Sequence, residues 1–326
     1  HRGCMVGNNS ASVVADALLK GVTPEKEWQT LYEAMMHART NVHPGVSSTG
    51  RLGHEYYNRL GYIPYDVKIN ENVARTLEYA YDDWCIAQVA RKLGKTEDAA
   101  ALEEASRNYR NVFDKTTKLM RGRNENGEFQ SPFSPYKWGD AFTEGNAWHY
   151  TWSVFHDVQG LAELMGGREG FAEMLDSVFV VPPIYDDSYY GFRIHEITEM
   201  QVADMGNYAH GNQPAQHMIY LYSYAGQPWK TQYWSRQITG RLYNSSERGY
   251  PGDEDQGGMS SWYILSSLGI YSVCPGTDQY VLGSPVFRKA TITMEDGRKF
   301  VIEADGNSQQ NVYIQSATLN GKPLDK

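Results

Sequence analysis

A glutamate among aromatic residues is the first group whose type and setting suggest chemistry. Glu144 stands in the segment TEGNAW, just before an expected helix that carries Trp148 and Trp152. A carboxyl group surrounded by aromatic side chains loses hydration, so its pKa rises and it can hold a proton near neutral pH. The segment therefore favours a general acid. The competing interpretation is an ordinary acidic residue that stabilises a helix N-terminus.

Three acidic residues crowd a second segment, GDEDQGG. Asp253, Glu254 and Asp255 stand together in a glycine-bounded loop before an expected buried helix. If the loop is buried, so much like charge is costly unless a cation, a proton or a substrate is shared. A calcium-binding EF-hand is excluded, because Ile264 stands where that motif needs its last glutamate. The alternative is an exposed acidic turn.

Two further segments offer possible ligands for a metal or a sugar. His195, Glu196 and Glu199 stand in HEITEM, which lacks the second histidine of a zinc-protease helix. The two glutamates fall on one helix face, and their oxygen atoms suit calcium or sugar hydroxyls better than zinc. Asn212 and Gln213 follow at the start of another expected helix. The alternative for each is a hydrogen-bonded polar residue of the core.

Helices must position these segments, because apolar residues recur at three- and four-residue spacing over most of the chain. We expect helices over residues 24–38, 73–93, 96–112, 148–164, 214–224, 228–243 and 258–268. Successive helices without a fixed-period repeat favour an (α/α) toroid over a solenoid of helix pairs.

The period changes after Gly269. Residues 280–282, 290–294 and 299–304 read as strands, and the last two are joined by a tight turn. The expected organisation is therefore a helical catalytic region over residues 1–272 and a β-strand module over residues 273–326.

Composition excludes several classes of protein. The net charge of -9 over 326 residues has the wrong sign for gripping a nucleic acid. No apolar run approaches the roughly 18 residues of a membrane span. The aromatic content of 13% suits sugar binding, although a tyrosine-rich core is the alternative. Cys4, Cys85 and Cys274 are too few and too widely spaced for a disulfide framework. Because the chain opens at His1 without a leader, we interpret it as a fragment.

The segments TEGNAWHYTW, HEITEM, HGNQPAQHMIYLYSYAGQPWKTQ and GYPGDEDQGGMSSWYILSSLGIYSVCPGTDQYVLGSP stand in this order on the chain. Together they resemble glycoside hydrolase family 92, the calcium-dependent exo-acting α-mannosidases. The resemblance covers roughly residues 142–285 and implies an (α/α)6 toroid, incomplete at its N-terminal side in this chain. It also implies an N-terminal β-sandwich domain that the chain does not include.

The resemblance implies that two carboxyl groups invert the anomeric carbon of a terminal mannose. Glu144 matches the general acid, and Asp255, with Asp253 beside it, matches the general base. In inverting glycosidases such a pair stands roughly 6.5 to 9.5 Å apart, which leaves room for a water molecule. Trp148 is expected to contact the substrate.

The resemblance also implies Ca²⁺, with ligands among Glu199, Asn212 and Gln213. The pair His195 and Glu196 matches residues with which α-1,2-specific members hold the leaving mannose. The expected partner is therefore a mannose-containing oligosaccharide or N-glycan, and the expected location is the periplasm or the exterior of a bacterium. We expect this chain alone to have little activity.

Two other functions stay open at this point. One is a non-catalytic mannose-binding remnant, against which the retained acid and base segments argue. The other is a sugar epimerase on an (α/α) toroid, which would need histidines as proton shuttles where this chain offers carboxylates.

Overall fold

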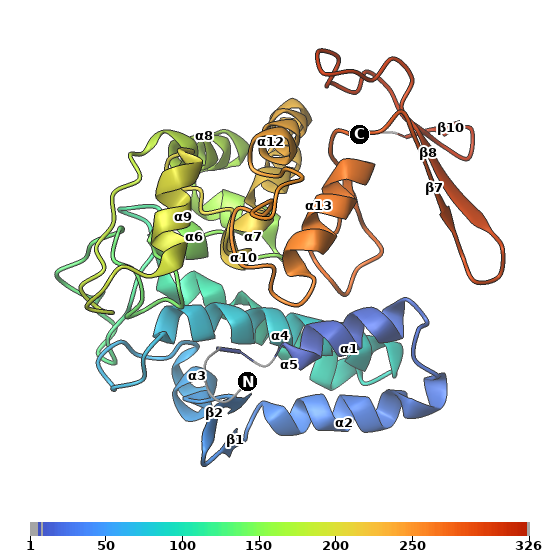
Figure 1. Ribbon diagram of the computed structural model, residues 1–326. Helices are drawn as coiled ribbons and strands as arrows, with labels where there is room; N and C mark the ends of the chain where they lie inside the picture. Colours follow the sequence, from blue (N-terminus) through green and yellow to red (C-terminus); the bar gives the residue numbers. More distant parts are fainter. Residues whose placement is uncertain (1–5, 8, 325–326) are drawn as a thin grey trace. The chain divides into compact units, whose positions relative to one another are not determined.

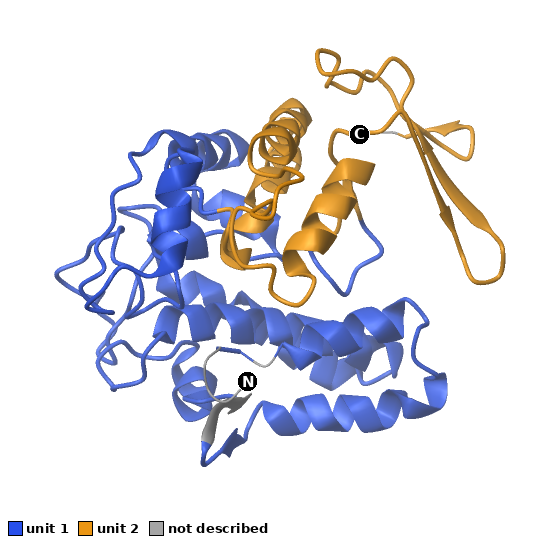
Figure 2. Cartoon of the chain, in the orientation of Figure 1, with its two compact units in different colours: residues 1–209, 274–279 blue, residues 210–273, 280–326 orange. Residues whose placement is uncertain are grey.

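The structure is a computed structural model that describes residues 6–7 and 9–324. His1 and Cys4 therefore lie outside the described residues. The chain divides into two compact units, shown in different colours in Figure 2. Unit 1 comprises residues 1–209 and 274–279, and unit 2 comprises residues 210–273 and 280–326.

Unit 1 is mainly helical in its described residues, with two short antiparallel strand pairs, β1 with β2 and β3 with β4 (Figure 1). Its elements are α1 (Ser10–Leu19), η1 (Glu25–Glu27), α2 (Trp28–Ala38), β1 (Val42–His43), β2 (Val46–Gly50), α3 (His54–Leu60), α4 (Asn72–Lys92), α5 (Thr96–Ala105), η2 (Ser106–Val112), β3 (Phe113–Asp114), β4 (Leu119–Met120), α6 (Ala147–Tyr150), α7 (Val158–Leu164), α8 (Arg168–Val180) and α9 (His195–Ala203).

Helix α4 is the central helix of unit 1 and contacts α1, α2, α5 and η2. Its Ile86 and Val89 join a buried cluster with Ala15 and Leu18 of α1 and Met35 of α2. Most residues of α4 are buried on every side, as expected of a helix whose apolar residues do not keep to one face. The start of α4 supports the loop that carries Glu144, because Val73 N and Ala74 N donate to Ala141 O at 3.0 and 3.2 Å.

Two aspartates are buried within α4. The Asp83 carboxylate accepts hydrogen bonds from Arg51 Nη1 at 2.7 Å and from Arg39 Nε at 2.7 Å. The Tyr57 hydroxyl donates to its other oxygen at 3.3 Å. Arg51 also lies 3.9 Å from Asp82. Buried charges persist when they are paired and hydrogen-bonded, so this network accounts for the buried charges of Asp83 and Arg51.

Unit 2 combines helices with short antiparallel strand pairs. Its elements are α10 (Gln213–Gln216), η3 (Met218–Tyr220), α11 (Leu221–Tyr224), α12 (Pro228–Arg241), α13 (Gly258–Leu268), β5 (Ile270–Tyr271), β6 (Val281–Leu282), β7 (Lys289–Thr293), β8 (Lys299–Glu303), β9 (Thr318–Leu319) and β10 (Lys322–Pro323). Helix α12 contacts α11 and α13. Strands β7 and β8 pair antiparallel from Lys289 opposite Glu303 to Thr293 opposite Lys299.

The expected helices over 73–93, 228–243 and 258–268 are confirmed as α4, α12 and α13, and the expected hairpin is confirmed as β7 and β8. The single helix expected over 148–164 is wrong. Helix α6 ends at Tyr150, and α7 begins only after Asp157, whose Oδ1 accepts the Gly160 amide at 3.0 Å. Residues 96–112 likewise change from α-helix to 3-10 helix after Ala105, and residues 214–224 are divided among α10, η3 and α11.

The proposed boundary between residues 272 and 273 stays a prediction. The strands after residue 280 belong to unit 2 together with α10–α13. Among the residues that the structure describes, no helix has both the length and the apolar character that crossing a membrane requires.

Candidate active site

Glu144 lies in a loop of residues 139–146 that we call the Glu144 loop. The helix that follows, α6, is capped by Asn146, whose side chain accepts the Trp148 amide at 2.9 Å. The Asn146 amide in turn donates to His149 Nδ1 at 3.1 Å. These two bonds form a capping box. The side chain that caps the helix is thus Asn146, and Glu144 stands outside the cap.

The backbone of the Glu144 loop is tied to itself and to the start of α4. Gly139 N donates to Gly145 O at 3.0 Å and closes the loop. Glu71 N donates to Asp140 O at 2.6 Å. Glu144 has φ +46°, in the left-handed region that side chains other than glycine rarely adopt. Such strained residues persist when their surroundings fix them, and they concentrate at functional sites.

The surroundings of this loop disfavour negative charge. Burial and then the charges of Glu78, Glu71 and Glu144 raise the pKa of the Tyr150 hydroxyl, which donates to Thr143 O at 2.8 Å. Burial, with help from Asp82, raises the pKa of Glu78 to about 8. Burial also raises the pKa of Glu71 in spite of a neighbouring arginine. A carboxyl group that must carry a proton near neutral pH requires this kind of environment.

Trp148 is buried, and its indole Nε1 has no hydrogen-bond partner among the described residues. Its ring lies 6.5 Å from the ring of Tyr136. Trp152 is fully buried, and its indole donates to Trp148 O at 2.8 Å. Trp152 therefore supports α6 from within the core.

Helix α9 carries the next three predicted site residues in its first turns. His195 Nε2 lies 3.2 Å from Glu196 Oε1, and His195 Nδ1 lies 2.8 Å from Glu199 Oε1. The imidazole is 56% exposed, whereas Glu196 is buried to 8% exposure. The remaining oxygen of Glu196, Oε2, has no hydrogen-bond partner among the described residues. The helix thus presents one imidazole and two carboxylates as a single hydrogen-bonded group.

In unit 2, Asp253 and Asp255 lie in a loop of residues 252–257 that we call the Asp255 loop. Both aspartates are exposed, so the loop is the exposed acidic turn that the sequence left open and is not a buried cluster of like charges. Glu254 instead caps α13, accepting the Gly257 amide at 2.6 Å and the Ser260 amide at 3.1 Å. Hydrogen bonds, first from the Ser260 side chain and then from the Gly257 amide, lower the pKa of Glu254. Because the two aspartates are exposed, solvent screens the repulsion between their charges.

Asn212 and Gln213 lie at the start of α10, also in unit 2. Asn212 is buried, and its Oδ1 accepts the Gln213 amide at 3.1 Å. The Gln213 side chain donates through Nε2 to Asp255 Oδ2, which leaves its carbonyl oxygen for another partner. With the carboxylate of Glu199 in unit 1, the predicted ligand set consists of oxygen atoms only. Oxygen donors of this kind fit Ca²⁺ and suit zinc poorly.

Sequence reasoning missed four residues around Glu144: Glu71, Glu78, Tyr150 and Tyr190. Glu71 and Glu78 are seven residues apart on or beside α4, a spacing that places them on one side of the helix. That spacing was a usable signal. The sequence contains no such signal for Tyr190, because its contact with Glu144 joins residues 46 positions apart.

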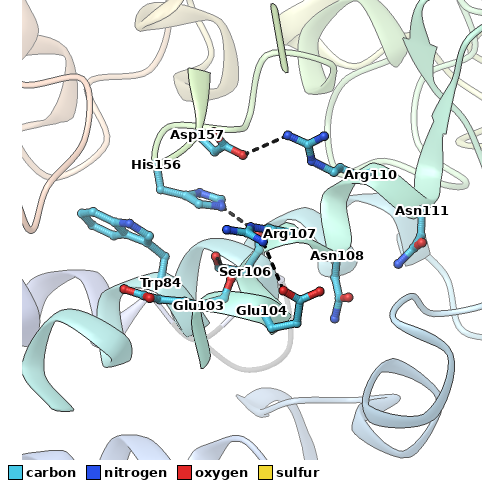
Figure 3. Close-up of a pocket in the computed structure, with 10 residues that line it drawn as sticks. All are labelled: Trp84, Glu103, Glu104, Ser106, Arg107, Asn108, Arg110, Asn111, His156 and Asp157. Carbon is cyan, nitrogen blue, oxygen red and sulfur yellow. Dashed lines mark hydrogen bonds and ion pairs between the residues drawn. The ribbon is translucent and has the colours of Figure 1, made fainter. Parts of the chain in front are cut away.

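A separate cavity of about 700 Å³ lies in unit 1 (Figure 3). None of the predicted site residues lines it. Its charged groups pair with one another: Arg107 lies 3.2 Å from Glu104, and Arg110 lies 3.5 Å from Asp157. His156 Nε2 bonds to Ser106 O at 2.8 Å. Because none of the predicted site residues lines it and these ion pairs occupy its charged side chains, the cavity does not compete with the Glu144 loop as the candidate site.

Comparison with known proteins identifies relatives. A curated relative, described as an uncharacterized secreted glycosidase from Arthroderma benhamiae, is 28% identical over 349 residues, which cover 97% of this chain and 42% of that protein. A solved inverting mannosidase of family 92 from Bacteroides thetaiotaomicron is 49% identical with a TM-score of 0.89, over 99% of this chain and 44% of that one.

A second solved family 92 α-mannosidase from the same organism, in complex with mannoimidazole, is 36% identical with a TM-score of 0.88. It is matched over 99% of this chain and 41% of that chain. These matches confirm the expected mainly helical (α/α) toroid fold with short antiparallel strand pairs near the C-terminus. The chain spans less than half the length of each of these relatives. The model of the glycosyl hydrolase family 92 catalytic domain matches residues 1–326, and the chain therefore belongs to glycoside hydrolase family 92.

Proposed function

We propose that this protein is an exo-acting, inverting α-mannosidase that removes terminal α-linked mannose from mannose-rich glycans. The observation that carries the proposal is the Glu144 loop: a strained, hydrogen-bonded loop holds the half-buried Glu144 beside groups whose pKa values burial raises, on a chain of family 92. Two matched solved structures are of mannosidases, one of them inverting, which supports both the sugar and the stereochemistry.

In this mechanism Glu144 is the general acid and protonates the glycosidic oxygen as the bond breaks. Asp255, with Asp253 beside it, is the general base and takes a proton from the attacking water. Exposure suits this role, because Asp255 must be ionised and in reach of water. Attack from the face opposite the leaving group converts the α-linkage into a β-configured product.

The other predicted residues bind the sugar. Trp148 lies in the first turn after the acid-bearing loop with a buried indole donor that has no partner among the described residues, and His195 and Glu196 offer paired polar groups for the leaving mannose. This pair supports a preference for α-1,2 linkages. When bound by oxygens of Glu199, Asn212 and Gln213, Ca²⁺ would supply a positive charge that orients sugar hydroxyls.

Export of the protein is part of the proposal, supported by the description of the Arthroderma relative as secreted. The proposal also includes an N-terminal β-sandwich domain, which is supported by the greater length of the relatives. The buried His149 and His210 argue against an epimerase that uses histidines as proton shuttles. Burial lowers the pKa of His149 to about 4 and that of His210 to about 3.

The test is to follow hydrolysis of an α-1,2-linked mannobiose by the full-length gene product with proton NMR. We expect β-mannose as the first product, before mutarotation. Glu144→Gln and Asp255→Asn should each lose at least about two orders of magnitude in turnover, since general acid or base catalysis contributes roughly 10² to 10⁴. Asp296→Asn, in the exposed β7–β8 turn, is the matched control. First-formed α-mannose, or no hydrolysis of any α-mannoside, would refute the proposal.

Calcium is tested separately. Exhaustive chelation should abolish hydrolysis, and added Ca²⁺ should restore it better than Zn²⁺ does, because the ligands are hard oxygen donors. Undiminished turnover in chelated enzyme that elemental analysis shows to be metal-free would remove calcium from the proposal.

A further inference from the structure

We propose that Tyr190 is a positioning residue that holds Glu144 in the conformation from which it donates its proton. The inference rests on the acid role proposed for Glu144 and adds a residue outside the predicted site. Its basis is a direct contact: Glu144 N donates a hydrogen bond to the Tyr190 hydroxyl oxygen at 3.1 Å.

This bond reaches the backbone of the residue that carries the reacting group. Glu144 has φ +46°, a conformation that a residue with a side chain leaves unless contacts hold it there. Its amide lies before the first turn of α6 and outside the capping box. The Tyr190 hydroxyl is therefore the acceptor that fixes this amide, and with it the direction in which the Glu144 side chain leaves the backbone.

Tyr190 is itself held in place. Its amide donates to Asp187 O at 3.0 Å. The residue before Asp187, Asp186, pairs with the extended segment that leads into the Glu144 loop. Asp186 N donates to Tyr136 O, and Trp138 N donates to Asp186 O, each at 2.9 Å. The loop that carries Tyr190 is thus tied directly to the entrance of the Glu144 loop.

The Tyr190 ring also packs against a buried cluster that includes Trp138 and, from α9, Ile197 and Met200. Helix α9 carries His195, Glu196 and Glu199, three of the predicted ligand residues. Tyr190 therefore connects the acid-bearing loop to the helix that presents the sugar- and metal-binding side chains, within one unit.

A glycine allows this close approach. A Cβ atom at Gly139 would lie 2.9 Å from Tyr190 Cζ and 2.3 Å from a ring atom of Tyr189. Gly139 also has φ +77°. The absence of a side chain at this position lets the two tyrosine rings lie against the loop.

The tyrosine stays neutral where the reaction takes place. Burial raises the pKa of Tyr190, and the negative charges of Glu144 and Glu71 raise it further. The hydrogen bond from the Glu144 amide has the opposite effect and lowers this pKa. A neutral phenol offers an acceptor to the Glu144 amide without placing a negative charge next to the acid. Phenylalanine would keep the ring and its packing and remove only the acceptor.

Misplacement of an acid has a recognisable kinetic signature. A displacement of about 1 Å can cost roughly 10² in rate, but only for a leaving group that needs a proton. An activated aryl mannoside with a dinitrophenolate leaving group needs little protonation, so its hydrolysis reports on the base and on sugar binding and is insensitive to the acid. Loss of fold or of sugar binding would reduce both rates.

The experiment compares Tyr190→Phe, Glu144→Gln and wild type in the full-length protein on α-1,2-mannobiose and on 2,4-dinitrophenyl α-mannoside. We expect Tyr190→Phe to lose about 10- to 100-fold in kcat on the disaccharide with KM within about twofold, and less than about threefold on the aryl mannoside. Tyr189→Phe removes a hydroxyl from the adjacent, exposed tyrosine and should leave both rates unchanged.

The outcomes separate the two proposals. If Glu144→Gln loses both rates equally, the acid is assigned wrongly, and the role of Tyr190 is refuted with it. If Glu144→Gln shows the leaving-group difference and Tyr190→Phe does not, the role of Tyr190 is refuted and that of Glu144 stands. An equal loss of both rates in Tyr190→Phe also refutes positioning, because it indicates a general structural role.

Discussion

The Glu144 loop of unit 1 and the Asp255 loop of unit 2 differ in how their carboxylates are held. The Glu144 loop is mostly buried, and its backbone bonds to itself, to the start of α4 and to Tyr190. The Asp255 loop exposes Asp253 and Asp255, and it uses Glu254 to cap α13. Both loops contain left-handed residues other than glycine, Glu144 in one and Asp255 in the other.

The difference matches the chemistry proposed for each loop. A general acid must keep its proton, which favours burial and fixed placement, whereas a general base must be ionised and in contact with water. Unit 1 holds another carboxylate in a fixed place: Asp83 is fully buried and forms ion pairs with Arg39 and Arg51. The comparison implies that substitutions of buried carboxylates in unit 1 should disturb structure and chemistry, whereas substitutions of the exposed Asp253 and Asp255 should disturb chemistry alone.

The largest expected effect separates the acid from the base. Glu144→Gln should lose roughly 10² to 10⁴ in turnover on mannobiose but little on a dinitrophenyl mannoside. Asp255→Asn should lose a similar factor on both substrates, because every substrate needs an activated water. Steady-state kinetics on the two substrates measure this. The same profile for both variants would show that the two loops do not have distinct roles.

The next prediction concerns stability in unit 1. Asp83→Asn removes the carboxylate 2.7 Å from the almost fully buried Arg51 and leaves it with the more distant Asp82, at 3.9 Å. Removing one partner of a buried ion pair costs about 3 to 5 kcal/mol in free energy of unfolding. Urea unfolding should show a lower midpoint for Asp83→Asn and an unchanged midpoint for Asp255→Asn. Equal midpoints for Asp83→Asn and wild type would show that the network does not stabilise the fold.

A third prediction uses pH to probe the cap of the Glu144 loop. His149 Nε2 bonds to Asn207 O at 2.7 Å and Nδ1 accepts the Asn146 amide, so the folded ring is neutral. Burial lowers its pKa to about 4, against the opposing effect of the Asn207 carbonyl. The unfolded chain binds a proton near pH 6.5, so it holds more protons than the folded chain between pH 6.5 and 4. Stability therefore falls as pH falls through this window.

The slope should approach about 1.4 kcal/mol per pH unit for this one histidine. The measurement is urea unfolding at several pH values from 7 to 4. His149→Gln cannot take up the proton and should reduce the slope, even if the variant is less stable at pH 7. His37→Gln, at an exposed position on α2, is the control and should leave the slope as in wild type. An unchanged slope in His149→Gln would place the acid sensitivity elsewhere.

Features of the fold that depend on residues close together in the sequence were predicted well, whereas contacts between residues far apart in the sequence were not. Helix α4 was predicted within one residue at each end, because its pattern and the glycine that ends it are local signals. The break between α6 and α7 was missed, although Asp157 is a good N-cap, because apolar residues continue the helical spacing across it. At the site, sequence located Glu144 but not Tyr190, since that contact depends on tertiary folding. The catalytic roles stay predictions.

The smallest expected effect lies within the Asp255 loop and distinguishes its three acids. Glu254 accepts two amides at the start of α13, so Glu254→Gln loses the charge and one of its two equivalent acceptors. The hydrogen bonds that lower the pKa of Glu254 stabilise the folded state above its unfolded pKa, and this contribution is lost as the pH falls. The variant should therefore melt at a slightly lower temperature at pH 7, by less than Asp83→Asn.

Turnover should hardly change in Glu254→Gln, because the two amides of α13 already occupy its carboxylate, whereas the adjacent Asp255 contacts Gln213 and is exposed to solvent. Calorimetry and kinetics on the same preparations test both parts, and Asp255→Asn is the matched comparison one residue away. If Glu254→Gln lost about a hundredfold in turnover on both substrates and melted as wild type does, Glu254 would be the base. In that case the hydrogen bonds to α13 would position a catalytic carboxylate, and the exposed aspartates would have no part in activating water.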